Sequence, residues 1–311
     1  MKWTCFVVNW LILFNPLLTS CVKALIVNGG AKSLPGQFPY VVSLVSLKDS
    51  YCSGSIIHKD FVLTAAHCVC SESGEINTDP LWIVAGTNNM RYRLYPAVKI
   101  SVEKVYVPTD FDPNTFVGDI AVLKLESSLD LDNNEFLQKI DLDTIGYERY
   151  KKKKASIAGF GCYELGYLIR DDGSYEGVEC LKHGVLHHGS AVILSNNKCQ
   201  KKFTKRSNIF FKTKVKTIHR SQLCTVLIPL QEHLTIGGCI GDSGSPIVIN
   251  GNIQVGVMSF GSKLCNDETL PCISIAVSSY ADFINKALAD SPPGQYLRSV
   301  NLPLNREVSS V

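Results

Sequence analysis

Three separated segments of the 311-residue sequence carry side chains that together could activate a nucleophile. Ser243 lies in the turn-like run Gly-Asp-Ser-Gly-Ser-Pro, His67 ends the run Thr-Ala-Ala-His, and Asp119 opens an apolar run. A serine hydroxyl is a weak nucleophile that needs a base, and the base needs a third group to orient it. Taken singly, the three segments have ordinary structural explanations as a tight turn, a core histidine and a strand-edge aspartate. Taken together, they predict nucleophilic catalysis by Ser243.

The residues around Ser243 suit a site that stabilises negative charge. Gly241 and Gly244 allow backbone conformations that other residues avoid, and they leave space for a substrate backbone. The N–H groups of Gly241 and Ser243 could then point at one spot, as an oxyanion hole requires. The sequence thus predicts Gly241 and Ser243 as the oxyanion-hole residues.

The order of the three groups along the chain narrows the family. His, then Asp, then Ser is the order found in chymotrypsin-type proteases, and other triad folds use other orders. The chain resembles the chymotrypsin-like serine proteases over about four-fifths of its length. The resemblance implies that His67 is the general base and acid, that Asp119 fixes its tautomer, and that Ser243 forms an acyl-enzyme. The matching motifs are residues 26–29, 64–68, 119–121, 241–244 and 280–284.

The resemblance also assigns a substrate pocket. Gly237, six residues before Ser243, stands where trypsin-like members carry Asp, so no negative charge awaits Arg or Lys. Cys272 stands near a position on the far wall where the family often has Gly, and its side chain would narrow the pocket. We therefore expect cleavage after medium-sized apolar residues. The predicted pocket residues are Gly237, Ser259, Phe260, Gly261 and Cys272.

The start of the matching region raises a question of maturation. In the family, cleavage frees an ammonium on the first residue, which pairs with the Asp before the catalytic Ser; here the pair would be Ile26 and Asp242. Zymogens usually carry Arg or Lys before that residue, whereas this chain has Leu25. We expect Ile26 to be exposed by an unconventional cut.

The amino-terminal segment predicts that the protein is secreted. Residues 1–25 resemble a signal peptide with a short pre-segment, and no apolar run is long enough for a membrane span. Ten cysteines follow, an even number that favours disulfides in a secreted protein. No metal tetrad is present, so we expect no cofactor and no metal. The resemblance implies the pairs Cys52–Cys68, Cys199–Cys224 and Cys239–Cys265, the 162–180 loop suggests Cys162–Cys180, and Cys70 and Cys272 have no obvious mates.

Short β-rich segments separated by turn residues predict an all-β protein. The resemblance implies a chymotrypsin-like fold of two six-stranded antiparallel β-barrels with a C-terminal helix. We expect the peptidase domain over residues 26–289, with a linker between the barrels near 140–154. Residues 280–289 have an apolar face at helical spacing and correspond to the closing helix. Residues 290–311 are expected to form a mobile tail.

One segment has no counterpart in the catalytic motifs. Residues 201–220 carry eight Lys and Arg with three Phe and no acidic residue, so this basic loop is either a solvated insertion or a contact for an acidic partner. The expected partners are protein or peptide substrates and protein protease inhibitors, and we expect a monomer. A catalytically weak homologue that acts as a binding or regulatory protein is the alternative, because the activation site and Cys272 depart from the family.

Overall fold

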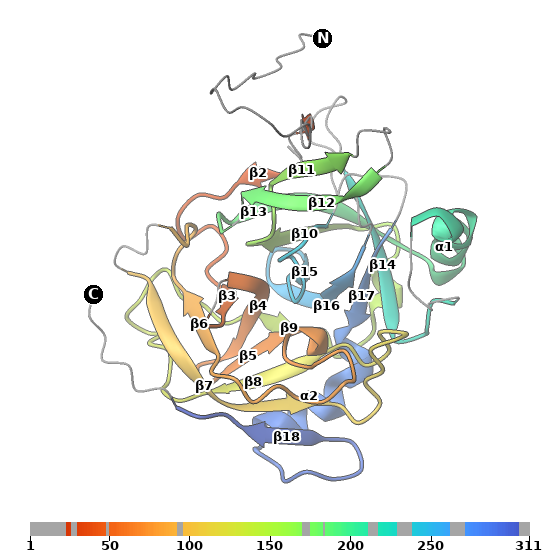
Figure 1. The fold of residues 1–311 in the computed structure, drawn as a ribbon. Helices are drawn as coiled ribbons and strands as arrows, with labels where there is room; N and C mark the ends of the chain where they lie inside the picture. The colour runs from red at the N-terminus through yellow and green to blue at the C-terminus, as the bar shows by residue number, and fades with distance from the viewer. Residues whose placement is uncertain are drawn as a thin grey trace, which may run out of the picture.

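Two antiparallel β-barrels, packed side by side, make up most of the chain (Figure 1). The computed structural model describes residues 23–25, 30–47, 50–91, 96–169, 175–182, 184–210, 217–228, 238–261 and 271–304. In each barrel six strands close into a ring, which removes the open edges that a sheet would otherwise expose. The predicted fold class of two six-stranded barrels with a C-terminal helix is therefore confirmed.

The first barrel is formed by strands from the amino-terminal half of the chain. It closes because β7 pairs with β8 as well as with β6. Val, Ile and Leu dominate these strands, and most of their residues are buried. The strands are β3 (Val41–Val45), β4 (Ser50–His58), β5 (Phe61–Thr64), β6 (Trp82–Ala85), β7 (Val98–Val107) and β8 (Ala121–Leu125).

The second barrel is closed by the pairing of β10 with both β13 and β15. Two short strands extend its sheet: β2 (Ala31–Lys32) pairs with β13, and β9 (Asp141–Leu142) pairs with β16. The six barrel strands are β10 (Lys154–Gly159), β13 (His187–Leu194), β14 (Gln222–Ile228), β15 (Pro246–Ile249), β16 (Ile253–Phe260) and β17 (Cys272–Ala276).

A small third sheet and five helical elements complete the described chain. The sheet contains β1 (Lys23–Leu25), β11 (Glu164–Ile169) and β12 (Tyr175–Lys182), and its β11–β12 hairpin is joined at its base by the predicted Cys162–Cys180 disulfide. The α-helices are α1 (Asn196–Phe210) and α2 (Ala281–Leu288), and the 3-10 helices are η1 (Ala66–Cys68), η2 (Tyr147–Tyr150) and η3 (Val277–Tyr280).

Two segments differ from the expectation. The first half of the basic loop belongs to helix α1, whose Cys199 and Phe203 lie four positions apart and are both buried. The segment after α2 was expected to be mobile, but it forms strand β18 (Arg298–Asn301), which pairs with β7 of the first barrel. Leu297 and Leu302, on either side of β18, are buried in the core.

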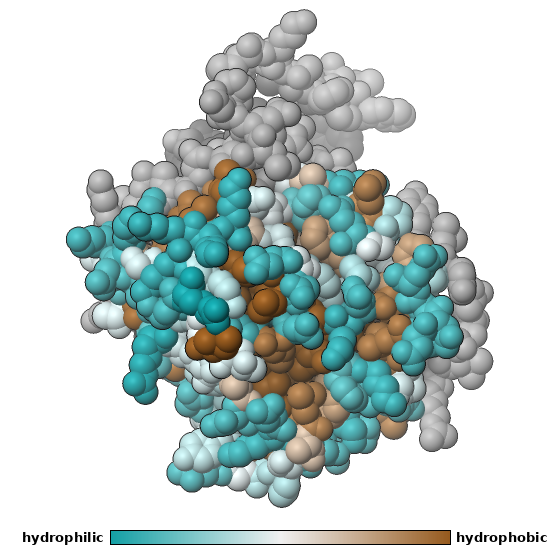
Figure 2. All heavy atoms as spheres, turned by 180° about the vertical axis from the view of Figure 1, so that it is seen from behind, coloured by the Kyte–Doolittle hydropathy of each residue, from teal (hydrophilic) through white to brown (hydrophobic). Residues whose placement is uncertain are grey.

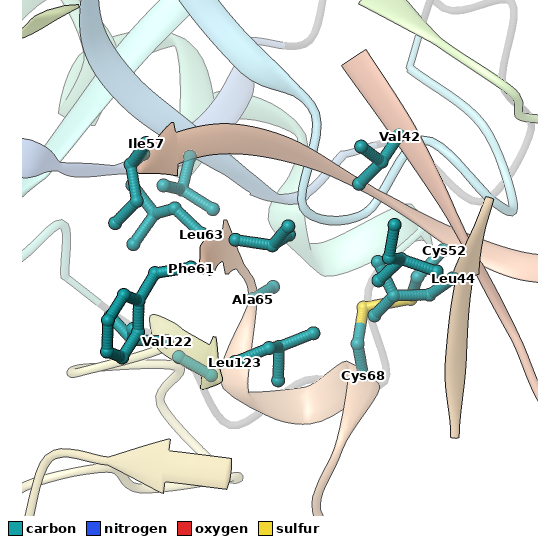
Figure 3. Packing of buried hydrophobic residues seen from close by; sticks show 14 of the residues in the cluster. Val42, Leu44, Cys52, Ile57, Phe61, Leu63, Ala65, Cys68, Val122 and Leu123 are labelled. Carbon is teal, nitrogen blue, oxygen red and sulfur yellow. A yellow bond between two sulfur atoms is a disulfide. The ribbon is translucent and has the colours of Figure 1, made fainter. Parts of the chain in front are cut away.

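The core of the first barrel lies directly beneath the segment that carries His67. Figure 3 shows Leu63, Val122 and Leu123 packed together, with the Cys52–Cys68 disulfide beside Leu44. This disulfide ties η1 to β4, so His67 is held against a rigid wall. A second cluster of buried residues fills the other barrel.

The face opposite to that of Figure 1 is mostly hydrophilic, with apolar side chains gathered near its centre (Figure 2). In the described part of the chain no helix is both long and apolar enough to span a membrane.

Candidate active site

His67 and Asp119 meet between the end of β5 and the start of β8. Asp119 Oδ2 lies 2.7 Å from His67 Nδ1, and Asp119 Oδ1 accepts a 2.8 Å hydrogen bond from the His67 backbone N–H. Ser259 Oγ donates to the same Oδ2 atom. Asp119 is fully buried, so these three donors compensate for the loss of its hydration. The contacts fix both the position and the ring orientation of His67.

The environment shifts the proton affinity of His67. Burial lowers the pKa of the imidazole, but the negative charge of Asp119 and its hydrogen bond outweigh burial, so the pKa lies above its usual value. The side chain of His67 is 27% exposed, which leaves part of the ring open to solvent. The arrangement therefore favours a proton on Nδ1, directed at Asp119, and a free Nε2 when His67 is neutral.

The Ser243 turn is held against the first barrel by Ser53 of β4. The Ser53 backbone N–H donates to the Ser243 carbonyl at 2.8 Å, and Ser53 Oγ donates to the Gly241 carbonyl at 3.0 Å. Gly244 has a φ of +83°, and a Cβ there would lie 2.0 Å from the Ser53 carbonyl oxygen and 2.3 Å from Thr64 Oγ1. Only glycine fits this close approach. It places the Ser243 turn against Thr64, the last residue of β5, which precedes His67 by three positions. Among the described residues, the Ser243 hydroxyl makes no hydrogen bond to His67.

The Asp242 carboxylate lies beside Gly159 and Gly161, at the end of β10. Its two carboxylate oxygens accept hydrogen bonds from the N–H groups of Gly161, at 3.1 Å, and Cys239, at 3.0 Å. Burial raises the pKa of Asp242 to about 6, although both hydrogen bonds lower it. Ile26, the predicted partner of Asp242, lies outside the described residues. Among the described residues, the Asp242 carboxylate therefore has two hydrogen-bond donors and no cationic partner.

The predicted pocket residues that the structure describes lie together beside the Ser243 turn. Cys272 Sγ would lie 3.3 Å from a Cβ placed at Gly238 and 3.5 Å from one at Gly261, so the sulfur fills the space between these two glycines. Burial raises the pKa of the Cys272 thiol to about 11, and the thiol is neutral. Phe260 pairs with Ile273, the residue after Cys272. Gly237 lies outside the described residues.

The structure adds three residues that the sequence analysis did not single out: Ser53, Phe116 and Met258. The Phe116 ring, on a residue with a φ of +54°, meets the His67 ring edge-on at 5.8 Å and the Phe260 ring at 5.1 Å. Met258 reaches the space beside Gly238, where a Cβ would lie 1.7 Å from Met258 Cε. Phe116 is an aromatic residue only three positions before Asp119, and this closeness in the sequence could have identified it.

Cysteine pairing follows the prediction where it can be described. The disulfides are Cys52–Cys68, Cys162–Cys180 and Cys199–Cys224. Cys239 is disulfide-bonded, and its predicted partner Cys265 lies outside the described residues. Cys70 and Cys272 are free and buried. A group of potential metal ligands in the described part, Cys52, His67 and Cys68, includes a disulfide, which offers no thiolate to a metal.

Comparisons with known proteins identify the family. Residues 27–284 match the family model described as Trypsin. The chain is 27% identical to a chymotrypsin of Phaedon cochleariae over 267 residues (83% of this chain and 80% of that protein) and 25% identical to neutrophil elastase of Mus musculus over 260 residues (84% and 82%).

A solved structure shows the same fold. Neuropsin, a serine protease expressed in mouse brain, superposes with a TM-score of 0.63 at 20% identity and covers 83% of this chain and 98% of its own. This likeness concerns the fold alone. The family match over most of the length, together with the barrel architecture, leads to one conclusion: the chain belongs to the trypsin family of serine proteases, whose substrates are proteins or peptides.

Proposed function

We propose that the protein is a secreted endopeptidase that hydrolyses peptide bonds with Ser243, His67 and Asp119 as its catalytic triad. The observation that carries the proposal is the buried Asp119, which accepts hydrogen bonds from His67 and Ser259 beside a turn whose conformation requires Gly244. Each contact orients a group that acyl transfer needs.

The proposed reaction begins when Ser243 Oγ attacks the scissile carbonyl carbon while its proton moves to His67 Nε2. The electron pair of the carbonyl moves to its oxygen, and the N–H groups of Gly241 and Ser243 stabilise the resulting oxyanion. His67 then gives its proton to the leaving amine, and an acyl-enzyme remains on Ser243. Water, deprotonated by His67, attacks the acyl carbon and regenerates the free serine.

We also propose a preference for medium-sized apolar residues at the position before the cleaved bond. The described wall of the pocket contains Cys272, Gly261 and Met258, and none of them carries a charge. Cys272 fills space that a glycine would leave open, which favours a smaller side chain than Phe or Tyr. The sulfur is neutral and apolar in character, so a buried Lys or Arg would lack a counter-ion.

A fluorophosphonate probe tests the nucleophile directly. The protein should be prepared both as the full chain and as a form that begins at Ile26, with Ser243→Ala as the control for each. We expect labelling of Ser243 in the form that begins at Ile26 and none in either control. A folded sample that stays unlabelled would contradict the proposed function.

Peptide cleavage tests the proposed specificity. We expect the labelled form to cleave a peptide with Val or Leu before the scissile bond at least tenfold faster, in kcat/KM, than one with Lys or Arg. The variant Cys272→Gly should shift the preference towards Phe, because it reopens the pocket. An unchanged Leu-to-Phe ratio in this variant would contradict the role of Cys272. Sequencing the amino terminus of the protein exported from a secretory host tests secretion and the cut before Ile26.

A further inference from the structure

The positive charge of this chain is concentrated in one continuous stretch. Residues 180–231 contain ten of the 31 Lys and Arg and none of the 28 Asp and Glu, which leaves 21 basic against 28 acidic residues elsewhere. A chain with a net charge of only +3 therefore carries a strongly basic segment on an otherwise acidic molecule. Such segregation creates a local positive potential that the net charge hides.

Helix α1 presents part of this charge on one face. Lys198, Lys201 and Lys202 lie at positions i, i+3 and i+4 of the helix, so their side chains leave the same side. All three are exposed, and in the described part of the chain none forms an ion pair. We call these three lysines the basic face of α1. Arg220, also exposed, lies on the segment that returns to β14.

The opposite side of α1 is anchored to the second barrel. Cys199 and Phe203 are fully buried, and the Cys199–Cys224 disulfide joins the helix to β14. Cys199 and Cys224 pack with Ile273, and Phe260 packs against the same cluster. Figure 1 shows α1 at the edge of the second barrel, beside β14. The basic face is thus held rigidly, at a fixed place relative to Phe260.

A line of aromatic rings connects this helix to the catalytic histidine. Phe203 meets Phe260 at 6.4 Å, Phe260 meets Phe116 at 5.1 Å, and Phe116 meets His67 at 5.8 Å between ring centroids. Gln222 Nε2 also donates to the Phe116 carbonyl at 3.2 Å, which fastens the return segment to the Phe116 loop. An extended peptide advances by about 3.4 Å per residue, so roughly five residues cover the line from His67 to Phe203, and further residues are needed to reach the exposed side of α1.

We propose that the basic face of α1 is an exosite for an acidic segment of the peptide substrate, about five or more residues on the amino-terminal side of the scissile bond. This inference rests on the proposed protease function. The acyl part of the substrate passes Ser259 and Phe260, and its continuation then reaches α1. Lysine is a point charge without a fixed fork of donors, so the exosite reads charge rather than a defined sequence.

The same positive charge could attract a sulfated polysaccharide, but the structure favours the substrate. Helix α1 lies at one end of the aromatic line whose other end is His67, so a substrate bound at Ser243 can bring an acidic segment to the exposed face of this helix at high effective concentration. A free polyanion would gain nothing from this continuity. The polysaccharide is therefore an outcome of the test rather than the proposal.

Three matched peptides test the exosite. One carries four Glu at positions five to eight before the scissile bond, one carries four Gln there, and one carries four Glu at the same distance after the bond. The protein is expressed from the full sequence in a secretory host, as the natural chain and as the triple variant Lys198→Gln, Lys201→Gln, Lys202→Gln. A control triple, Lys32→Gln, Lys59→Gln, Lys139→Gln, removes the same charge from exposed lysines on other elements.

We expect kcat/KM to be about tenfold higher for the amino-terminal Glu peptide than for the Gln peptide at ~50 mM salt, and about twofold higher at ~500 mM. The α1 triple should reduce the low-salt ratio to below about threefold, and the control triple should leave it unchanged. The carboxy-terminal Glu peptide should show no advantage. Hydrolysis of the Gln peptide should be alike in all three proteins.

Contrary outcomes are distinct. Equal hydrolysis of the Glu and Gln peptides, or equal loss in both triples, overturns the exosite and leaves the protease function standing. The proposal is also overturned if the Glu and Gln peptides have equal kcat/KM and the α1 triple is retained more weakly than the natural chain on a heparin column. That result would assign the surface to polysaccharide binding. If no peptide is cleaved, either by the exported protein or by the form that begins at Ile26, the protease function fails. Binding of the fluorescent peptides to Ser243→Ala protein then decides: a preference for Glu over Gln that is lost in the α1 triple supports the exosite, and its absence overturns the exosite.

Discussion

Asp119 is the residue whose environment says most about the reaction. It is fully buried, and its charge raises the pKa of His67 above the usual value against the effect of burial. Because only neutral His67 can accept the serine proton, the rate should fall as pH drops through this raised pKa. The acidic limb of the pH profile of kcat/KM is therefore expected above pH ~6.5.

The variant Asp119→Asn tests this coupling. The amide keeps the shape but loses the charge, so kcat should fall by about 10³–10⁴-fold and the acidic limb should move to lower pH. The measurement is kcat/KM from pH 5 to 9 for both proteins, with unfolding temperature as the control for folding. A limb that stays in place would show that Asp119 does not set the pKa of His67.

Asp242 makes a second prediction that depends on pH. Burial raises the pKa of Asp242 to about 6 in the chain described here, so the folded state holds a proton that the unfolded chain releases near pH 4. The associated stability is present below pH ~4 and is lost as pH rises through about 6. An Ile26 ammonium beside Asp242 would lower the pKa again and remove this loss.

Thermal unfolding from pH 4 to 8 checks the prediction. The form that begins at Ile26 should be more stable than the full chain at pH 7–8, and the difference should shrink below pH 6, where Asp242 becomes protonated in the full chain. Asp242→Asn should abolish the pH dependence of the difference. A difference independent of pH would mean that Ile26 stabilises the protein without pairing with Asp242.

At the scale of elements, β4 positions the Ser243 turn through Ser53. Ser53 Oγ donates to the Gly241 carbonyl and accepts from the Phe160 N–H, both at 3.0 Å, so one hydroxyl joins three segments. Gly241 is one of the two proposed oxyanion donors, and the carbonyl that Ser53 holds lies in the next peptide unit, so Ser53 restricts the backbone conformation of Gly241 that aims its N–H. Ser53 is a positioning residue, because it acts through the turn rather than on the substrate.

Ser53→Ala should lower kcat by about tenfold, with little change in KM, and should cost about 1–2 kcal/mol of unfolding free energy. Ser55→Ala is the matched control. Ser55 lies on the same strand, is equally buried, and donates to Gln254 Oε1 at 2.7 Å without contacting the turn. Both variants should lose similar stability, and only Ser53→Ala should lose kcat. Equal loss of kcat in both would reduce Ser53 to a structural role.

The sequence predicted those elements whose motifs are contained within a few consecutive residues. The Gly-rich turn around Ser243, the Ala-Ala-His run and the apolar strand after Asp119 each have a pattern within a few residues, and the resemblance then gave the barrels. Ser53 and Phe116 escaped because their roles arise from contacts with residues far along the chain. The helix α1 escaped because its many lysines resemble a solvated loop until Cys199 and Phe203 are seen on one side.

At the scale of the whole molecule, residues 290–304 pack against the first barrel, which the amino-terminal half of the chain forms. After α2, the chain crosses to the first barrel, where Leu302 N–H donates to the Glu103 carbonyl and Arg298 donates to the Gly74 carbonyl. Asp290 binds Lys104 and Lys124, both at 2.8 Å, at the point of crossing. Residues 290–304 are thus part of the first barrel's structure rather than an appendage.

Leu297→Ala should therefore cost about 2–5 kcal/mol of unfolding free energy, because Leu297 is buried in the first barrel core. Leu304→Ala is the control, since Leu304 is 39% exposed, and it should change stability by less than about 0.5 kcal/mol. Urea unfolding of the two variants makes the comparison. Similar small effects would mean that β18 packs only loosely in solution.

The pairing of β18 with β7 bears on how the protein would withstand the protease activity proposed for it. The three disulfides described in full each lie within one half of the chain and do not join the two barrels. A nick between β8 and β10, made by another protease molecule, would still leave two fragments held together, because the later fragment contributes a strand and two buried leucines to the earlier one. Self-digestion at that site should thus leave a clipped enzyme that elutes as one particle and separates into its pieces only in denaturant.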